Sequence, residues 1–174
     1  MTCPAYTWGS TPEERRTGFG CDRHLPAADD AYFRALDVEA PASTVFRWVC
    51  QLRVAPYSYD WIDNFGRRSP QSLTPGLDEL EVGQRAMTVF EIVDFEPGRH
   101  LTLATKRSAG GEFAVTYSVF PRGGAASRLV VKILARYPRG LVGWIARRLL
   151  PWGDLVMMRR QLLNLKHLAE RRSL

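Results

Sequence analysis

The sequence has few cysteines, few lysines and no long apolar run. Its three cysteines, Cys3, Cys21 and Cys50, lie far apart and form no Cys-x-x-Cys pair, which argues against a zinc site and a disulfide framework. No apolar stretch reaches the roughly 18 residues that a membrane span needs. Residues 1–8 also lack the basic start and apolar segment of a secretion signal. We therefore expect a cytoplasmic protein that holds no metal and no cofactor.

The composition is that of a globular protein. The chain has 174 residues, of which 45% are hydrophobic and 24% charged, a size and balance that suit one folded domain. The net charge of +6 comes almost entirely from arginine, in pairs scattered along the chain. No nucleic-acid-binding motif accompanies these pairs, so we interpret them as solvated surface and expect no nucleic acid partner. A monomer and a homodimer are both compatible with the sequence.

The first 31 residues differ from the rest of the chain. Prolines and glycines recur through residues 1–31 and predict an irregular N-terminal arm, in which Thr11–Glu14 can open one helical turn. Residues 32–174 are predicted to form the folded domain, beginning with a strand over 32–39. A short helix should follow, and a second over 57–64. The apolar side of the first helix would carry Val45, Phe46, Val49 and Leu52.

Four strands of an antiparallel meander are predicted next, because glycine-rich turns separate four segments of alternating apolar residues. The residues expected on the inner face are Met87, Val89, Glu91, Val93 and Phe95, then Leu101, Leu103, Thr105 and Arg107, then Phe113, Val115, Tyr117 and Val119, and last Leu129, Val131, Ile133 and Ala135. Pairing across the hairpins predicts one row across the sheet that reads Glu91, Thr105, Val115, Ile133.

The last element is a long helix with an expected interruption. Residues 140–172 have helical character, but Pro151 lacks a backbone donor and should divide the helix into two segments, with Asp154 as a cap for the second. Beyond it, one apolar stripe is formed by Leu155, Met158, Leu162, Leu165 and Ala169. The chain is therefore predicted to be an α+β protein, with a curved antiparallel sheet wrapped around a long C-terminal helix kinked near Pro151.

Residues 32–171 resemble the START-like, or SRPBCC, superfamily, which includes polyketide cyclase/dehydrase-like proteins and has the helix-grip fold. The resemblance rests on the order of elements and on three local features. These are Val38-Glu39-Ala40-Pro41 leading into Val45-Phe46, Val93-Asp94-Phe95-Glu96-Pro97 before Leu101, and the terminal helix. Residues 57–64, Tyr-Ser-Tyr-Asp-Trp-Ile-Asp-Asn, resemble a narrower bacterial branch. The resemblance implies a cavity between sheet and helix, entered near the short helices.

Glu91 is the most conspicuous candidate for a functional residue. Its place in the alternation points a carboxylate at the apolar side of the sheet, where a lone charge is costly and must be paired or protonated. Thr105 and Arg107 lie on the same predicted face and can be its partners. Two interpretations remain open, a structural ion pair and a polar anchor inside the cavity.

Other candidates come from the 57–64 segment and from the predicted cavity walls. Aromatic and acidic side chains can line the pocket mouth or pack the short helix onto the sheet, and the candidates there are Tyr57, Tyr59, Asp60, Trp61 and Asp63. Leu103, Tyr117, Trp152 and Met158 are expected to wall the cavity, with ordinary core packing as the alternative.

Three functions fit these observations. The leading hypothesis is a non-catalytic binding or carrier domain for an apolar small molecule, such as a lipid or a polyketide. The second is a cyclase or dehydratase in which a cavity carboxylate acts as general base. The third is a peripheral membrane protein, because residues 140–152 mix apolar and aromatic side chains with Arg147 and Arg148.

Overall fold

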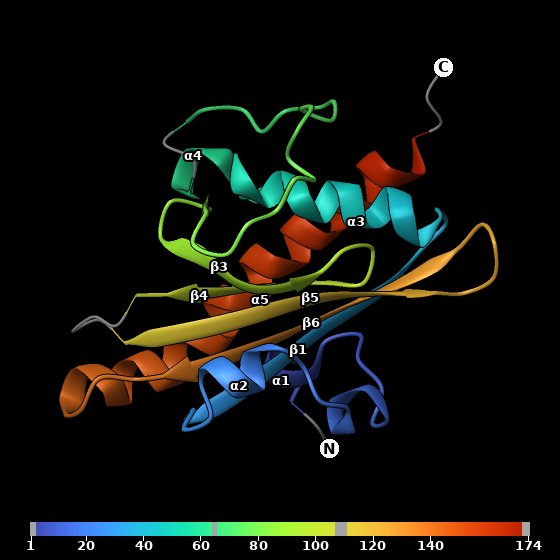
Figure 1. Ribbon diagram of the computed structural model, residues 1–174. Coiled ribbons are helices and arrows are strands. Elements are labelled where there is room, and N and C mark those ends of the chain that lie inside the picture. The colour runs from blue at the N-terminus through green and yellow to red at the C-terminus, as the bar shows by residue number, and fades with distance from the viewer. Residues whose placement is uncertain (1–2, 64–65, 107–110, 172–174) are drawn as a thin grey trace.

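A six-stranded antiparallel sheet lies at the centre of the computed structural model, which describes residues 3–63, 66–106 and 111–171 (Figure 1). The strand order is β1-β6-β5-β4-β3-β2, so the four meander strands are neighbours and the first strand pairs with the last. The strands are β1 (Asp30–Val38), β2 (Arg85–Ala86), β3 (Phe90–Glu96), β4 (His100–Thr105), β5 (Glu112–Pro121) and β6 (Ser127–Arg136). The predicted meander is therefore confirmed, and β2 extends it by one short strand.

The inner face of the sheet packs against helices. These are α3 (Ala42–Cys50), continued by η2 (Gln51–Arg53), then α4 (Asp60–Asp63) and α5 (Leu141–Glu170). Figure 1 shows α3 and α5 together on one side of the sheet. Val45, Phe46, Val49 and Leu52 are all buried, as their spacing predicts. Each buried side chain of this size contributes about 1.5–3 kcal/mol, so these contacts hold the inner layer together.

The N-terminal arm is more regular than its prolines and glycines predict. It contains α1 (Pro4–Thr7), η1 (Glu14–Arg16) and α2 (Cys21–His24). The expected turn at Thr11 is confirmed, because the Thr11 hydroxyl accepts a hydrogen bond from the Glu14 amide and the Glu14 carboxylate accepts one from the Thr11 amide. α1 contacts β1 and α5, and α2 contacts β4, β5 and β6. The part of the arm around α2 thus covers the outer face of the sheet, where a second apolar cluster forms around Phe19, Cys21 and Leu25, whereas Tyr6 and Trp8 pack against the inner core beside α5.

A β-bulge in β3 changes which side chains face inward. Ile92 pairs with Leu103 and Asp94 pairs with Thr102, so Val93 is an extra residue between them. Before the bulge the even-numbered residues face the inner core, and after it Phe95 does. The observed row across the sheet is therefore Ile92, Leu103, Val115, Ile133 and Tyr32. The expected row was right for Val115 and Ile133 and wrong for Glu91 and Thr105.

Helix α5 runs without interruption through Pro151, so the prediction of two segments is wrong. Tertiary contacts hold the helix at this point: the fully buried guanidinium of Arg34 bonds to the Pro151 carbonyl oxygen at 3.4 Å and to Asp154 at 2.7 Å. A bend, unlike a break, is compatible with a continuous helix. The predicted inner stripe is confirmed at Met158, Leu162, Leu165 and Ala169, which are buried, while Leu155 is half-buried.

Candidate ligand-binding site

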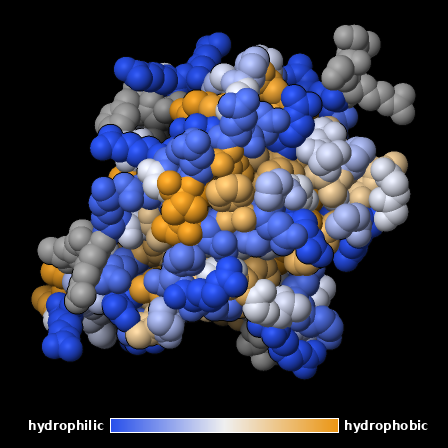
Figure 2. Space-filling model, viewed as in Figure 1, coloured by the Kyte–Doolittle hydropathy of each residue, from blue (hydrophilic) through white to orange (hydrophobic). Residues whose placement is uncertain are grey.

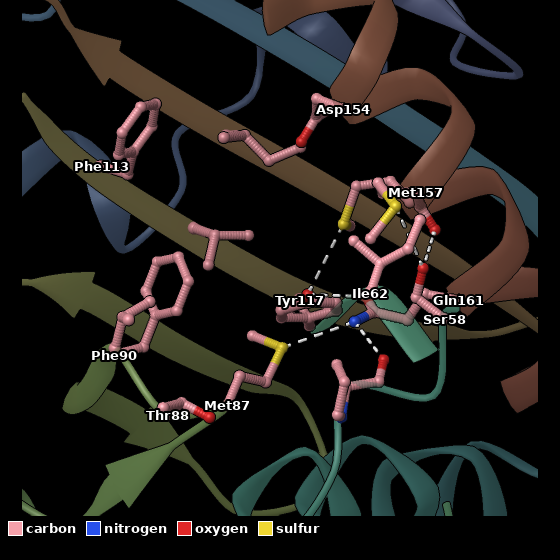
Figure 3. Close-up of a pocket in the computed structure, with 15 residues that line it drawn as sticks. Ser58, Ile62, Met87, Thr88, Phe90, Phe113, Tyr117, Asp154, Met157 and Gln161 are labelled. Carbon is pink, nitrogen blue, oxygen red and sulfur yellow. Dashed lines mark hydrogen bonds between the residues drawn. The ribbon is translucent and has the colours of Figure 1, made fainter. Parts of the chain in front are cut away.

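A cavity of about 410 Å³ lies between the inner face of the sheet and α5. Apolar side chains dominate its wall, among them Met87, Phe90, Phe113, Val115, Ile133, Met157 and Met158. Figure 3 shows Phe90 and Phe113 projecting from the strands toward the side chains of α5. Three of the four methionines in the sequence line this cavity. Because methionine is unbranched and adaptable, such a wall can fit ligands of irregular shape.

Most polar groups of the cavity wall satisfy one another. The Tyr117 hydroxyl donates to Gln161 Oε1 at 2.7 Å, and Gln161 Nε2 donates to the Pro56 carbonyl oxygen at 2.6 Å. The Ser58 hydroxyl donates to the Met157 carbonyl oxygen at 3.0 Å. Burial is the largest cause of a raised pKa at Tyr117, which therefore stays neutral. These bonds leave the centre of the wall with little unsatisfied polarity.

Asp154 is the exception, because it brings a carboxyl group to the cavity wall. It projects from α5, and its Oδ2 atom lies 2.7 Å from Nη2 of Arg34, which projects from β1. Burial raises the pKa of Asp154 to about 6, and the nearby Arg34 guanidinium only partly opposes that shift. The Asp154 side chain keeps 23% of its surface exposed. Since Asp154 lines the cavity, a ligand there would meet this carboxyl group.

A second hollow of about 520 Å³ continues the first toward the N-terminal half of α5. The two share five lining residues, namely Ile62, Phe113, Ile133, Asp154 and Met157. The second hollow adds Tyr32, Leu149, Leu150 and Gly153. The Tyr32 hydroxyl is hydrogen-bonded to that of Tyr137. The shared residues make one elongated apolar space with Asp154 at its middle.

Of the side chains that the sequence predicts as cavity walls, Tyr117 and Met158 line this space. Leu103 faces inward but is fully covered by core packing. The Thr105 hydroxyl is bonded to the backbone of Phe113 across the hairpin. Trp152 is 54% exposed and points away from the cavity, because it lies on the opposite side of α5 from Asp154, which lines the cavity. Neither Thr105 nor Trp152 lines either hollow.

Glu91 lies on the outer side of its strand, so its predicted position in the cavity is wrong. Its Oε1 atom is 2.8 Å from Nζ of Lys106, whose side chain is 76% exposed. The bulge at Val93 is the reason, since it shifts the alternation by one residue and turns Ile92 inward instead. Glu91 therefore forms a surface ion pair. Its expected partner Arg107 lies outside the described residues.

The 57–64 segment does not form the cavity mouth as one group. Asp60 accepts hydrogen bonds from the backbone and hydroxyl of Ser69, and Tyr59 lies beneath the guanidinium of Arg160. Tyr57 is buried against Trp48, with a φ of 55° and a hydroxyl that has no hydrogen-bond partner among the described residues. Burial raises the pKa of Tyr57 to about 12. Tyr57 and Asp60 border a separate polar hollow of about 210 Å³.

Two neighbouring residues face the apolar space differently. Trp61 is 75% exposed and lines neither hollow, whereas Ile62 lines both. The side chain of Asp63 and the whole of residue 64 lie outside the described residues. The segment therefore contributes Ser58 and Ile62 to the cavity, rather than its more conspicuous aromatic and acidic residues.

Sequence reasoning missed the Arg34–Asp154 pair and Gln161. Arg34 alternates with Tyr32, Leu36 and Val38, so the same period-two argument used elsewhere points its side chain inward. Asp154 was assigned to a helix cap because a break at Pro151 was expected. Gln161 follows Met158 by three residues and thus lies on the inner side of α5. Within the described residues, no three His, Cys, Asp or Glu side chains are grouped so as to hold a metal ion.

Comparisons with known proteins concern the fold. No protein-family model matches the chain. No curated protein matches it either. Among solved structures, the Zhui aromatase/cyclase from a Streptomyces species has a TM-score of 0.56 at 15% identity, over 82% of this chain and 94% of that chain. A Mesorhizobium loti protein gives 0.53 at 15%, over 83% and 99%. A Chromobacterium violaceum protein gives 0.52 at 14%, over 82% and 98%. The chain therefore has the expected helix-grip fold.

Proposed function

On the basis of this START-like helix-grip fold, we propose that the protein binds or carries an apolar small molecule, lipid-like or polyketide-like, between the sheet and α5. The observation that supports the proposal most directly is the elongated apolar space with its methionine wall. A packed core of this size would leave no room of about 410 Å³. Small-molecule sites have this character, mostly apolar with a few placed polar groups. Asp154 would meet a hydroxyl or amine of the ligand.

Titration with a neutral naphthylamine-type fluorescent probe tests the proposal. We expect binding with micromolar affinity, about 8 kcal/mol. Met157→Trp should weaken binding at least tenfold, because the larger side chain enters the space at a residue that lines both hollows. Leu163→Trp, at an exposed position further along the same helix, is the matched control and should bind as the parent does. Equal binding by both variants would contradict the proposal.

A second candidate function is a cyclase or dehydratase, and the raised pKa of Asp154 favours it. A carboxyl group whose pKa is about 6 can act as a general base near neutral pH, and Arg34 would keep its orientation fixed. The aromatase/cyclase with a similar fold supports testing a polyketide-like substrate. Asp154→Asn separates the two functions in the same titration: a carrier should bind the neutral probe with unchanged affinity, and an enzyme should lose about a hundredfold in turnover.

A further inference from the structure

The N-terminal half of α5 exposes an apolar face to solvent. Leu141, Ile145, Leu149, Trp152 and Val156 recur at steps of three and four and form what we call the α5 patch. Their exposed fractions range from 42% at Ile145 to 72% at Leu141. The opposite side of the same turns is buried at Gly143 and Pro151. This half of the helix is therefore apolar on two sides, of which the rest of the protein covers only the side with Gly143 and Pro151.

The charged side chains of residues 139–153, the segment that contains four of the five patch residues, have one sign, and Asp154 beyond it is paired with Arg34. Residues 139–153 include Arg139, Arg147 and Arg148 and contain no aspartate or glutamate. The Arg148 guanidinium lies 5.0 Å from the ring centre of Trp144, which is 58% exposed. Arg147 forms an ion pair with Asp30. Arg139 and Arg148 take part in none of the described ion pairs, so they carry the remaining positive charge of this segment. An apolar helix face with tryptophan and flanking arginine is typical of helices that lie in the interface of a bilayer.

The α5 patch is continuous with the opening of the elongated apolar space between the sheet and α5. Leu149 belongs to the patch and also lines the second hollow, together with Ile62, which is 53% exposed. On the other side of the space, Val89 is 62% exposed and lines the main cavity. Figure 2 shows an apolar area over the start of β3 on an otherwise largely hydrophilic face. In Figure 1 the first turns of α5 extend past the ends of β5 and β6. Nothing in the described fold covers these turns from outside.

We propose that the α5 patch docks on the surface of an anionic lipid bilayer, with the opening of the ligand space facing the lipid. Apolar side chains would enter the boundary between headgroups and acyl chains, and the arginines would meet the anionic headgroups. An apolar ligand could then pass between bilayer and cavity without crossing water. No helix of the described chain could span a membrane. Docking goes beyond ligand binding and does not depend on what the cavity holds.

Vesicle co-sedimentation of the full chain tests the docking. The vesicles contain roughly one part phosphatidylserine to two parts phosphatidylcholine, and a second set contains phosphatidylcholine alone. The test variant is Leu141→Glu/Ile145→Glu, which changes two patch residues that line neither hollow. The matched control, Val54→Glu/Leu163→Glu, adds the same charge at exposed positions outside the patch. Far-ultraviolet circular dichroism checks that both variants fold.

We expect the parent to sediment with the anionic vesicles, the control to do so within a factor of about two, and the patch variant to bind at least tenfold more weakly. Neutral vesicles should retain little of any protein. Equal losses in both variants would mean that net charge alone drives binding, and would overturn the proposal. The proposal would also be overturned if the parent did not bind vesicles but formed a dimer, measured by light scattering, that the patch substitutions abolish and the control substitutions do not. Probe binding in vesicle-free solution, unchanged in the patch variant, keeps this test separate from that of the cavity.

Discussion

The two faces of the sheet are covered in different ways. At the free edge of β1, the N-terminal arm approaches the strand so closely that a Cβ on Gly9 would collide with the Ala35 carbonyl oxygen, and beyond this point the arm crosses to the outer face. The Cys21 amide donates to the Thr116 hydroxyl at 2.8 Å, and that hydroxyl lies 3.0 Å from the Thr102 hydroxyl. On the inner face, one long helix spans the curved sheet and leaves the elongated apolar space. Both faces keep a hollow, but the one of about 510 Å³ beside α2 is bordered largely by charged and polar side chains, whereas the inner one is walled by apolar side chains.

The contrast lies in what each layer leaves uncovered. The arm is hydrogen-bonded to the strands, and the hollow beside it is bordered by charged side chains, among them Asp22, Arg23 and Arg99. A straight helix cannot follow a curved surface, and the gap it leaves is walled by whatever side chains point inward. The buried Arg34–Asp154 pair bridges sheet and helix beside that gap. The pair that joins sheet and helix thus also borders the apolar space.

Breaking the Arg34–Asp154 pair should have the largest effect on stability. Asp154→Ala leaves the fully buried guanidinium of Arg34 without its partner, and we expect the free energy of unfolding to fall by about 3–5 kcal/mol in urea denaturation. The double variant Arg34→Met/Asp154→Leu removes both charges and should recover most of that loss. A single variant that loses less than about 1 kcal/mol would show that the pair carries little of the contact between sheet and helix.

The pH dependence of stability should have opposite signs on the two faces. Burial raises the pKa of Asp154 to about 6, so the parent should lose up to about 3 kcal/mol relative to Asp154→Asn as pH rises from about 4 to about 6. On the outer face burial would raise the pKa of Asp94, but hydrogen bonds from Arg23 and His100 outweigh it and lower the pKa. The stability that Asp94 contributes is therefore lost as pH falls below about 4.

Parent and variants are compared by urea denaturation across this pH range, with Asp94→Asn as the matched variant for the outer face. The difference between the parent and each variant isolates one carboxyl group from all the others. Profiles of the same sign for the two variants would refute the contrast between the faces.

Loosening the arm should have the smallest effect. Gly9 has a φ of 73° and no space for a Cβ, so Gly9→Ala should cost about 2 kcal/mol and speed amide hydrogen exchange in residues 3–25. Gly18→Ala is the control, because nothing lies near that position and its backbone is unstrained. Probe binding in the cavity should be unchanged in both. Weaker probe binding by Gly9→Ala would show that the N-terminal arm also shapes the cavity on the inner face.

Elements with a strong period were predictable from the sequence. The four meander strands follow from the alternation of apolar residues between glycine-rich segments, and the buried stripe of α5 follows from its steps of three and four. Tyr117 and Met158 were located in the cavity wall by the same reasoning. The 57–64 segment was not predictable in this way, because short helices present too few turns to fix a face. Its aromatic and acidic side chains bond to Ser69 and to α5 instead.

The sequence by itself determined the fold class and the order of strands and helices, because those depend on local periodicity and on turn residues. Tertiary structure decided which polar group reaches the cavity. One extra residue at Val93 turned Glu91 outward, and the continuity of α5 through Pro151 brought Asp154 to Arg34. The bulge depends on the partner strand, and the continuity of α5 at Pro151 depends on contacts with β1. Such contacts join residues that are distant in sequence, so they leave no periodic signal in the chain.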